Sequence, residues 1–207
     1  GSGQLDGLER NHFENNMRGV GLPTNEVDEI DINTTFTNNS FAEVEIFGST
    51  YEASRTSTWQ NLNGDAKYRV TGNVIIDGEL TIAAGASFEF DENIEFFING
   101  ALIAKGTSTD RIVMTTSNVA GGILWKGIYF NSSSSLNEID FADISYGGRS
   151  NMIFTVSDFS AIIGIVLNSK FTITISSISI SGAYCIFNKC EINANANTSN
   201  TFSSLPE

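Results

Sequence analysis

The sequence predicts an all-β protein, a right-handed parallel β-helix with a repeat of about 20–23 residues. Three observations lead to this fold class. The composition is low in charge, at 17%, and rich in small polar residues and glycine. Apolar residues alternate with polar ones over short segments, which is typical of half-buried strands. Short sequence patterns also recur at a nearly constant spacing, which is typical of solenoids.

The recurring patterns occur as three separate pairs. The first two have offsets of about 23 and 22 residues, and the third has an offset of about 20. The pairs are Phe13–Asn16 with Phe36–Asn39, Asp77–Ile82 with Asn99–Ala104, and Val166–Ser169 with Ile186–Lys189. Because a single turn cannot bury its apolar face alone, we expect successive turns to stack and to share one core.

Within each repeat the apolar residues follow a two-residue period and end at Gly, Asn or Asp, so each segment is expected to be a strand that ends at a tight corner. Asn pairs suit the corners because Asn tolerates left-handed backbone conformations. Six side chains are expected to point into the core: Ile82, Phe90, Ile98, Met114, Ile128 and Phe130.

The segment from Phe171 to Ser181 illustrates how a corner is recognised. Ile173 and Ile175 alternate with threonines, then Ser176-Ser177 breaks the phase before Ile178 and Ile180 resume it. A single strand with one buried face would not change phase in this way. We therefore expect a corner at Ser176-Ser177, with the two isoleucine pairs on different sheets.

The domain organisation divides the chain at a polar segment. Residues 1–47 are expected to form N-terminal β-helix turns, residues 48–66 a polar connecting segment, and residues 67–207 the main β-helix. In this interpretation the first turns end a preceding unit. The alternative is a single solenoid that is interrupted by a long excursion.

Charge and cysteine content exclude several classes of function. The formal net charge is -13 and the sequence pI is about 4.3. Such a surface repels nucleic acid and anionic membranes. No apolar run approaches the ~20 residues of a membrane-spanning helix, so we expect no membrane insertion of this segment.

Cys185 and Cys190 are too few for a disulfide framework, and they can bridge only if the chain turns between them.

The start of the chain carries no signal peptide. Gly1-Ser2-Gly3 is typical of a cloning remnant, so we expect the natural precursor to be longer at its N-terminus.

From Tyr68 onward the sequence resembles the right-handed parallel β-helix modules of bacterial cell-surface and secreted proteins, especially those of Bacteroidetes, within the pectin-lyase-like superfold. The resemblance rests on five stretches: Tyr68–Val74, Gly78–Gly85, Gly100–Gly106, Trp125–Phe130 and Ile139–Gly148. It implies an extracellular or cell-surface location. It implies little about activity, because this superfold carries lyases, hydrolases, adhesins and modules without known chemistry.

The candidates for catalysis are few. The only histidine, His12, corresponds to Thr35 in the next repeat, so we interpret it as a polar structural position. Asp140 and Asp143, with Arg149 nearby, could form an acidic cluster if a corner near Ala142 turns both carboxylates outward. We identify no catalytic residue, and the chain is expected to lack enzymatic activity.

No cofactor or metal motif is present. The acidic run of Asp28, Glu29 and Asp31 is a weak calcium candidate, because it lacks EF-hand spacing.

Trp125 and Tyr129 are the candidate ligand-binding residues. If Ile128 and Phe130 point inward, alternation along the strand places Trp125, Gly127 and Tyr129 outward, with Gly127 forming the floor between two rings. Exposed aromatic rings suit sugars, and the net negative charge favours a neutral glycan or cell-surface polymer. The predicted function is a non-catalytic extracellular surface module for adhesion, spacing or weak glycan contact. The alternative is a polysaccharide lyase or glycoside hydrolase.

Overall fold

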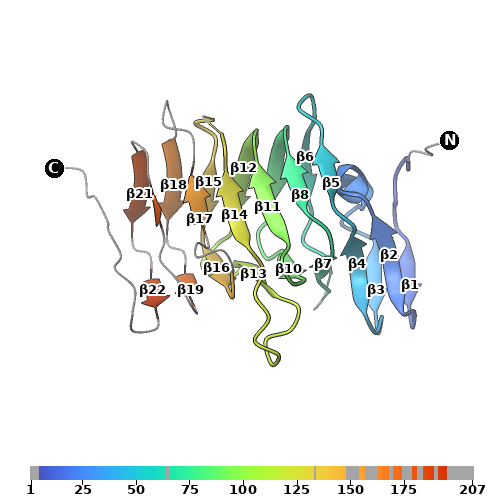
Figure 1. Cartoon of the computed structure of the whole chain (residues 1–207). Coiled ribbons are helices and arrows are strands. Elements are labelled where there is room, and N and C mark those ends of the chain that lie inside the picture. Colours follow the sequence, from blue (N-terminus) through green and yellow to red (C-terminus); the bar gives the residue numbers. More distant parts are fainter. Residues whose placement is uncertain are drawn as a thin grey trace.

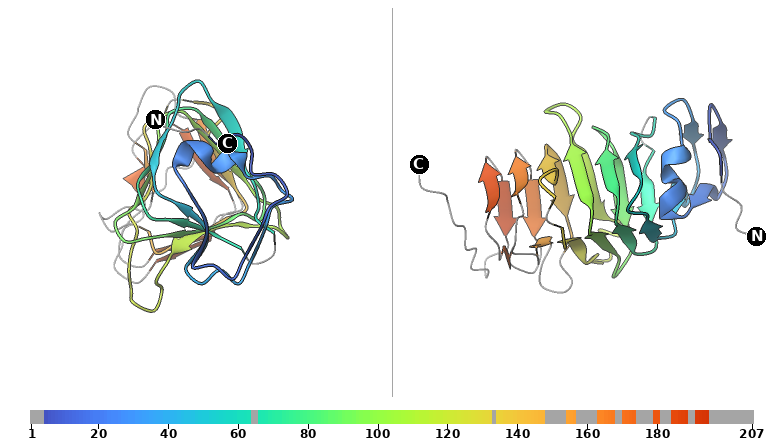
Figure 2. Two further views of the ribbon diagram at one scale, coloured as in Figure 1. Left: turned by 90° about the vertical axis from the view of Figure 1, so that its right-hand side faces the viewer. Right: turned by 90° about the horizontal axis from the view of Figure 1, so that it is seen from above.

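The chain winds into a parallel β-solenoid in which each turn stacks on the preceding one (Figure 1). The computed structural model describes residues 5–63, 66–132 and 134–147 in full, together with the backbone of six later strands. Seen along its axis, the solenoid has a roughly triangular outline (Figure 2). All strand pairs are parallel, as the predicted β-helix requires, and the described part of the chain contains only one short helix.

Three sheets form the sides of the triangle. Sheet I has eight strands: β2 (Arg18–Leu22), β4 (Ala42–Ile46), β7 (Tyr68–Val70), β10 (Ser87–Phe90), β13 (Ile112–Thr116), β16 (Ala142–Ser145), β19 (Lys170–Ile173) and β22 (Glu191–Ala194). Sheet II has six strands: β5 (Ser49–Tyr51), β8 (Val74–Ile76), β11 (Glu95–Ile98), β14 (Gly127–Phe130), β17 (Phe154–Val156) and β20 (Ser179–Ile180). Sheet III also has six: β6 (Thr56–Trp59), β9 (Glu79–Ile82), β12 (Ala101–Lys105), β15 (Glu138–Asp140), β18 (Ile163–Leu167) and β21 (Tyr184–Asn188).

A fourth, two-stranded sheet and a 3-10 helix lie at the N-terminal end. Strands β1 (His12–Glu14) and β3 (Thr35–Thr37) pair with each other, and η1 (Thr24–Glu29) packs against β5 and β6 (Figure 2). Pro23 precedes η1, and Val27 is fully buried. The sequence pattern contains no sign of this helix, because six residues are too few for a helical period to appear.

The strand register confirms two of the three predicted echoes. Phe13 pairs with Phe36, and their rings stack with centroids 5.3 Å apart. Leu80 pairs with Leu102, as the 22-residue offset requires. The third echo is one residue out, because Val166 pairs with Phe187 instead of Ile186.

The core confirms the predicted inward positions. Ile82, Phe90, Ile98, Met114, Ile128 and Phe130 are all at most 3% exposed. At the corners, Asn15, Asn38 and Asn93 adopt positive φ angles, as expected for left-handed Asn turns. Strands β19 and β20 lie on sheets I and II, which agrees with a change of sheet between Ile173 and Ile180. Ser176-Ser177 themselves lie outside the described residues.

The polar segment 48–66, expected to connect two units, contributes strands to the solenoid. Its residues form β5 and β6, which pair with β8 and β9. Sheet I meanwhile runs from β4 directly to β7. The segment is polar because Thr50, Thr56 and Thr58 occupy outward or partly exposed positions, while Tyr51 and Trp59 are buried.

Candidate functional site

The two predicted ligand-binding residues occupy different environments. Trp125 is fully buried: its indole stacks on Phe90 with centroids 4.1 Å apart, and its Nε1–H donates to the Ser145 carbonyl at 2.8 Å. The predicted outward position of Trp125 is therefore wrong. It lies before β14, in the loop 117–126 that turns from sheet I to sheet II, so the alternation of β14 does not extend to it. Gly127 has a φ of 106° and is itself buried, so it is no groove floor.

Tyr129 does point outward, from the middle of β14, and it is half-buried. Its ring stacks on Phe97 of β11, with centroids 4.6 Å apart and planes 15° apart. Ile75 of β8 is in register with Phe97 and is also half-buried. These three side chains form the outer stripe of sheet II. The 22-residue echo could have revealed the pairing of Ile75 with Phe97, whereas the 32-residue step to Tyr129 is too long for that pattern.

A row of amide and carboxylate groups runs beside the outer stripe, where the strands of sheet II end. Asn99 Nδ2 donates to Asp77 Oδ1 at 2.7 Å, and Asn131 Nδ2 donates to Asn99 Oδ1 at 3.1 Å. On the other side of the stripe, Glu95 pairs with Lys126 at 3.5 Å. An aromatic and aliphatic row is thus bordered by hydrogen-bonding groups.

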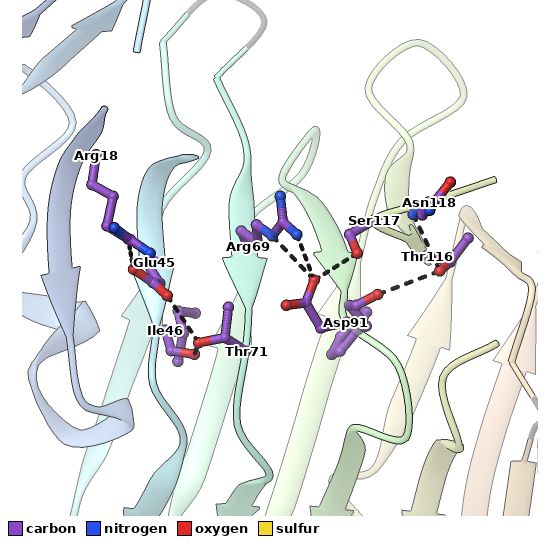
Figure 3. Close-up of polar contacts among 10 residues, drawn as sticks. Arg18, Glu45, Ile46, Arg69, Thr71, Asp91, Thr116, Ser117 and Asn118 are labelled. Carbon is purple, nitrogen blue, oxygen red and sulfur yellow. Dashed lines mark hydrogen bonds and ion pairs between the residues drawn. The ribbon is translucent and has the colours of Figure 1, made fainter. Parts of the chain in front are cut away.

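The outer face of sheet I carries a different kind of row (Figure 3). Arg18 forms an ion pair with Glu45, and Arg69 forms one with Asp91 at 3.0 Å. The Ser117 hydroxyl donates to the same Asp91 oxygen at 2.6 Å. The Phe41 ring lies beneath both guanidinium groups, at 4.4 Å from Arg18 and 3.9 Å from Arg69. Each of these contacts connects neighbouring turns of the solenoid.

Ion pairs between turns account for most of the described cations. Seven of the eight Lys and Arg residues in the fully described part of the chain pair with a carboxylate on an adjacent turn, at sequence separations from 22 (67 to 89) to 33 (105 to 138). These pairs are Arg18–Glu45, Arg55–Asp28, Lys67–Glu89, Arg69–Asp91, Lys105–Glu138, Arg111–Asp143 and Lys126–Glu95. Their carboxylates are therefore engaged in holding turns together.

The corner predicted near Ala142 is present at Phe141, and Asp140 and Asp143 on either side of it occupy outward, half-buried positions. Phe141 has a φ of 47° and turns the chain from β15 on sheet III to β16 on sheet I. Asp140 therefore lies on one sheet and Asp143 on the next, where Arg111 binds Asp143 at 2.8 Å. Arg149 lies outside the described residues.

Each side chain of the acidic run near η1 has a protein donor, although the buried Oδ1 atom of Asp28 has no hydrogen-bond partner. Asp28 pairs with Arg55 at 2.8 Å, and Glu29 accepts the Gly7 N–H at 2.9 Å. Hydrogen bonds from the Thr34 hydroxyl and the Arg10 backbone N–H hold the pKa of Asp31 well below its usual range. Within the fully described residues, no group of three or more His, Cys, Asp or Glu side chains could hold a metal ion.

His12 makes a contact between two neighbouring turns. His12 is exposed and in register with Thr35, as the repeat predicted, and its Nδ1 lies 2.7 Å from the Thr35 hydroxyl. The side chains of Cys185 and Cys190 lie outside the described residues.

In the part of the chain that the structure describes, no helix has the length and apolar character to cross a membrane.

Neither the protein-family models, nor the curated proteins, nor the solved structures gave a match to the chain.

Proposed function

We propose that the chain is a non-catalytic module of an extracellular bacterial surface protein, in which the solenoid serves as a spacer for adhesion and presents the outer face of sheet II for contact. This proposal agrees with the resemblance of residues 68–148 to pectin-lyase-like surface modules. It agrees also with the stacking of turns along a single axis (Figure 1).

The observation that carries the proposal is the set of seven ion pairs between adjacent turns. A general acid or base must be free to exchange a proton with a substrate, and its pKa is usually shifted toward the working pH. Glu45, Asp91 and Asp143 are each bound instead to a guanidinium group of the neighbouring turn. Such pairs tie one turn to the next, which suits a rod that spans a distance.

The alternative, a polysaccharide lyase or glycoside hydrolase, finds less support. Glycoside hydrolases use two carboxyl groups roughly 5 to 10 Å apart across one bond, and one of them must stay protonated. Asp140 and Asp143 lie on different sheets, and Asp143 is held by Arg111. The ion pair engages the Asp143 carboxylate in a contact between turns, which does not favour a pair of this kind.

The proposal can be tested on bacteria that express the native protein. An antibody against this chain should label intact cells, and external protease should remove the label. The purified chain should release no reducing ends and no unsaturated products from uronate or neutral polysaccharides. Labelling only after lysis would contradict the surface location. Product release that disappears in the Asp143→Asn variant would favour the enzymatic alternative.

A further inference from the structure

The outer stripe of sheet II crosses successive strands and therefore runs along the solenoid axis. Ile75, Phe97 and Tyr129 occupy the same register position on three consecutive strands. The backbone register continues through Thr50 before them and Thr155 after them. At about 4.8 Å per strand, these five positions span about 19 Å. A row of this shape matches a linear polymer that lies parallel to the axis.

The chemistry beside the stripe differs from that of the stripe itself. The amide row lies two residues further along each strand, about 7 Å away. Asn99 is exposed, and it uses one N–H for Asp77 and one oxygen lone pair for Asn131. One N–H and one lone pair of Asn99 therefore remain for a ligand. An apolar row and a parallel hydrogen-bonding row complement a sugar chain, which presents C–H groups beside hydroxyl groups.

Charge decides between the polymers that could lie there. Asp77 borders the stripe on one side, Glu95 on the other side is paired with Lys126, and the whole chain carries a net charge of -13. Anionic polymers are repelled by this arrangement. A second copy of the chain would bring the same negative charge. The stripe would also offer that copy only three partly buried apolar side chains, Ile75, Phe97 and Tyr129.

We infer that the outer stripe binds an uncharged polysaccharide chain aligned with the solenoid axis. Phe97 and Tyr129 contact its C–H groups, and Asn99 binds its hydroxyl groups. This inference rests on the proposed role of sheet II as a contact surface, and it names the ligand class and the residues. Because Phe97 and Tyr129 stack on each other, a good part of each ring faces the other. The contact area left for a sugar is small, and the affinity of one module is correspondingly low.

The test uses the full chain and soluble neutral polymers: a β-glucan, a xylan and a mannan, with polygalacturonate as the anionic comparison. Binding is measured by affinity electrophoresis and by calorimetric titration. Phe97→Thr and Tyr129→Thr should each weaken binding to the retained neutral polymer about three- to tenfold. Ile103→Thr is the matched control, because Ile103 is an outward, half-buried apolar residue in the middle of sheet III. It should leave binding unchanged.

A further variant tests binding even if a substitution in the outer stripe lowers the stability of the fold. Asn99→Ala changes an exposed corner side chain and should weaken binding without loss of the folded state. Three results would each overturn the inference. The chain could bind none of the neutral polymers, all variants could bind equally well, or polygalacturonate could bind more tightly than the neutral polymers. These results leave the surface location untouched, because that is tested separately on intact cells.

Discussion

The indole of Trp125 lies flat on the ring of Phe90, with centroids 4.1 Å apart and planes 10° apart. The contact closes the core below the ten-residue loop 117–126, the longest connection between sheets I and II in the fully described part of the chain. The Nε1–H bond to Ser145 ties the same ring to the next strand of sheet I. This loop protrudes from the solenoid (Figure 1), yet Trp125 near its end is anchored in the interior.

Trp125→Ala should therefore destabilise the protein. Removal of a fully buried tryptophan leaves a cavity, which typically costs about 3–5 kcal/mol in the free energy of unfolding. The variant Trp125→Phe keeps the stack on Phe90 and should lose clearly less. Urea unfolding of both variants measures the difference. Equal stability of wild type and Trp125→Ala would mean that the loop does not close the core.

The ion pair between Arg69 and Asp91 should couple adjacent turns measurably. Both side chains are partly buried, and Arg69 also lies over the Phe41 ring. A double-mutant cycle with Arg69→Met and Asp91→Asn should give a coupling free energy of about 0.5–1 kcal/mol. About 1 M NaCl should reduce it, because salt screens partly exposed charges. The Lys105–Glu138 pair, with Lys105 53% exposed, is the comparison and should couple more weakly. The reverse order would contradict a role for burial.

Asn38 tests the requirement for left-handed corners. Its φ is 55° and its side chain is exposed, so a substitution there acts mainly through the backbone. Asn38→Ala should cost about 1 kcal/mol, because a Cβ without a polar group is disfavoured in this conformation. Asn38→Gly should be close to neutral, since glycine adopts positive φ without steric cost. Thermal unfolding would show the difference, and equal loss in both variants would point to the side chain instead.

Tyr68 should make the fold sensitive to alkaline pH. Burial raises the pKa of its hydroxyl well above the ordinary value of 10.0, and the hydroxyl donates to the Gln60 carbonyl at 2.7 Å. The folded state keeps Tyr68 neutral, whereas the unfolded chain ionises near pH ~10. The stability that Tyr68 contributes is thus complete below that pH and decreases as the pH rises further.

The comparison with Tyr68→Phe isolates this effect from other groups that titrate at alkaline pH. At pH ~8 the variant should be less stable by about 0.5–1.5 kcal/mol, because it lacks the hydrogen bond. Above pH ~10 the wild type should lose stability faster, so the two curves should converge. Urea unfolding between about pH 8 and pH 11 measures both. Parallel curves over this range would show that Tyr68 is not buried as a neutral group.

The sequence by itself determined the solenoid, its inward side chains and most of its corners. Two-residue alternation decides which face of each strand is buried, so the inward positions of Phe90 and Ile128 follow from the amino-acid pattern alone. The echo of Phe13 in Phe36 likewise predicted a register pairing, because stacked turns place equivalent residues side by side. Asn15 and Asn38 marked corners through a local backbone preference.

Only the tertiary structure decided where the contact surface lies. Alternation holds within a strand, and Trp125 lies outside β14, so its burial depends on how the loop 117–126 folds back onto Phe90. The turns differ in length, with 22 residues from Ile75 to Phe97 and 32 from Phe97 to Tyr129. A constant period therefore cannot predict that these three side chains form one row. The ion-pair partner of each charged side chain could not be predicted for the same reason. Arg111 and Asp143 meet across a turn whose length the sequence pattern does not specify.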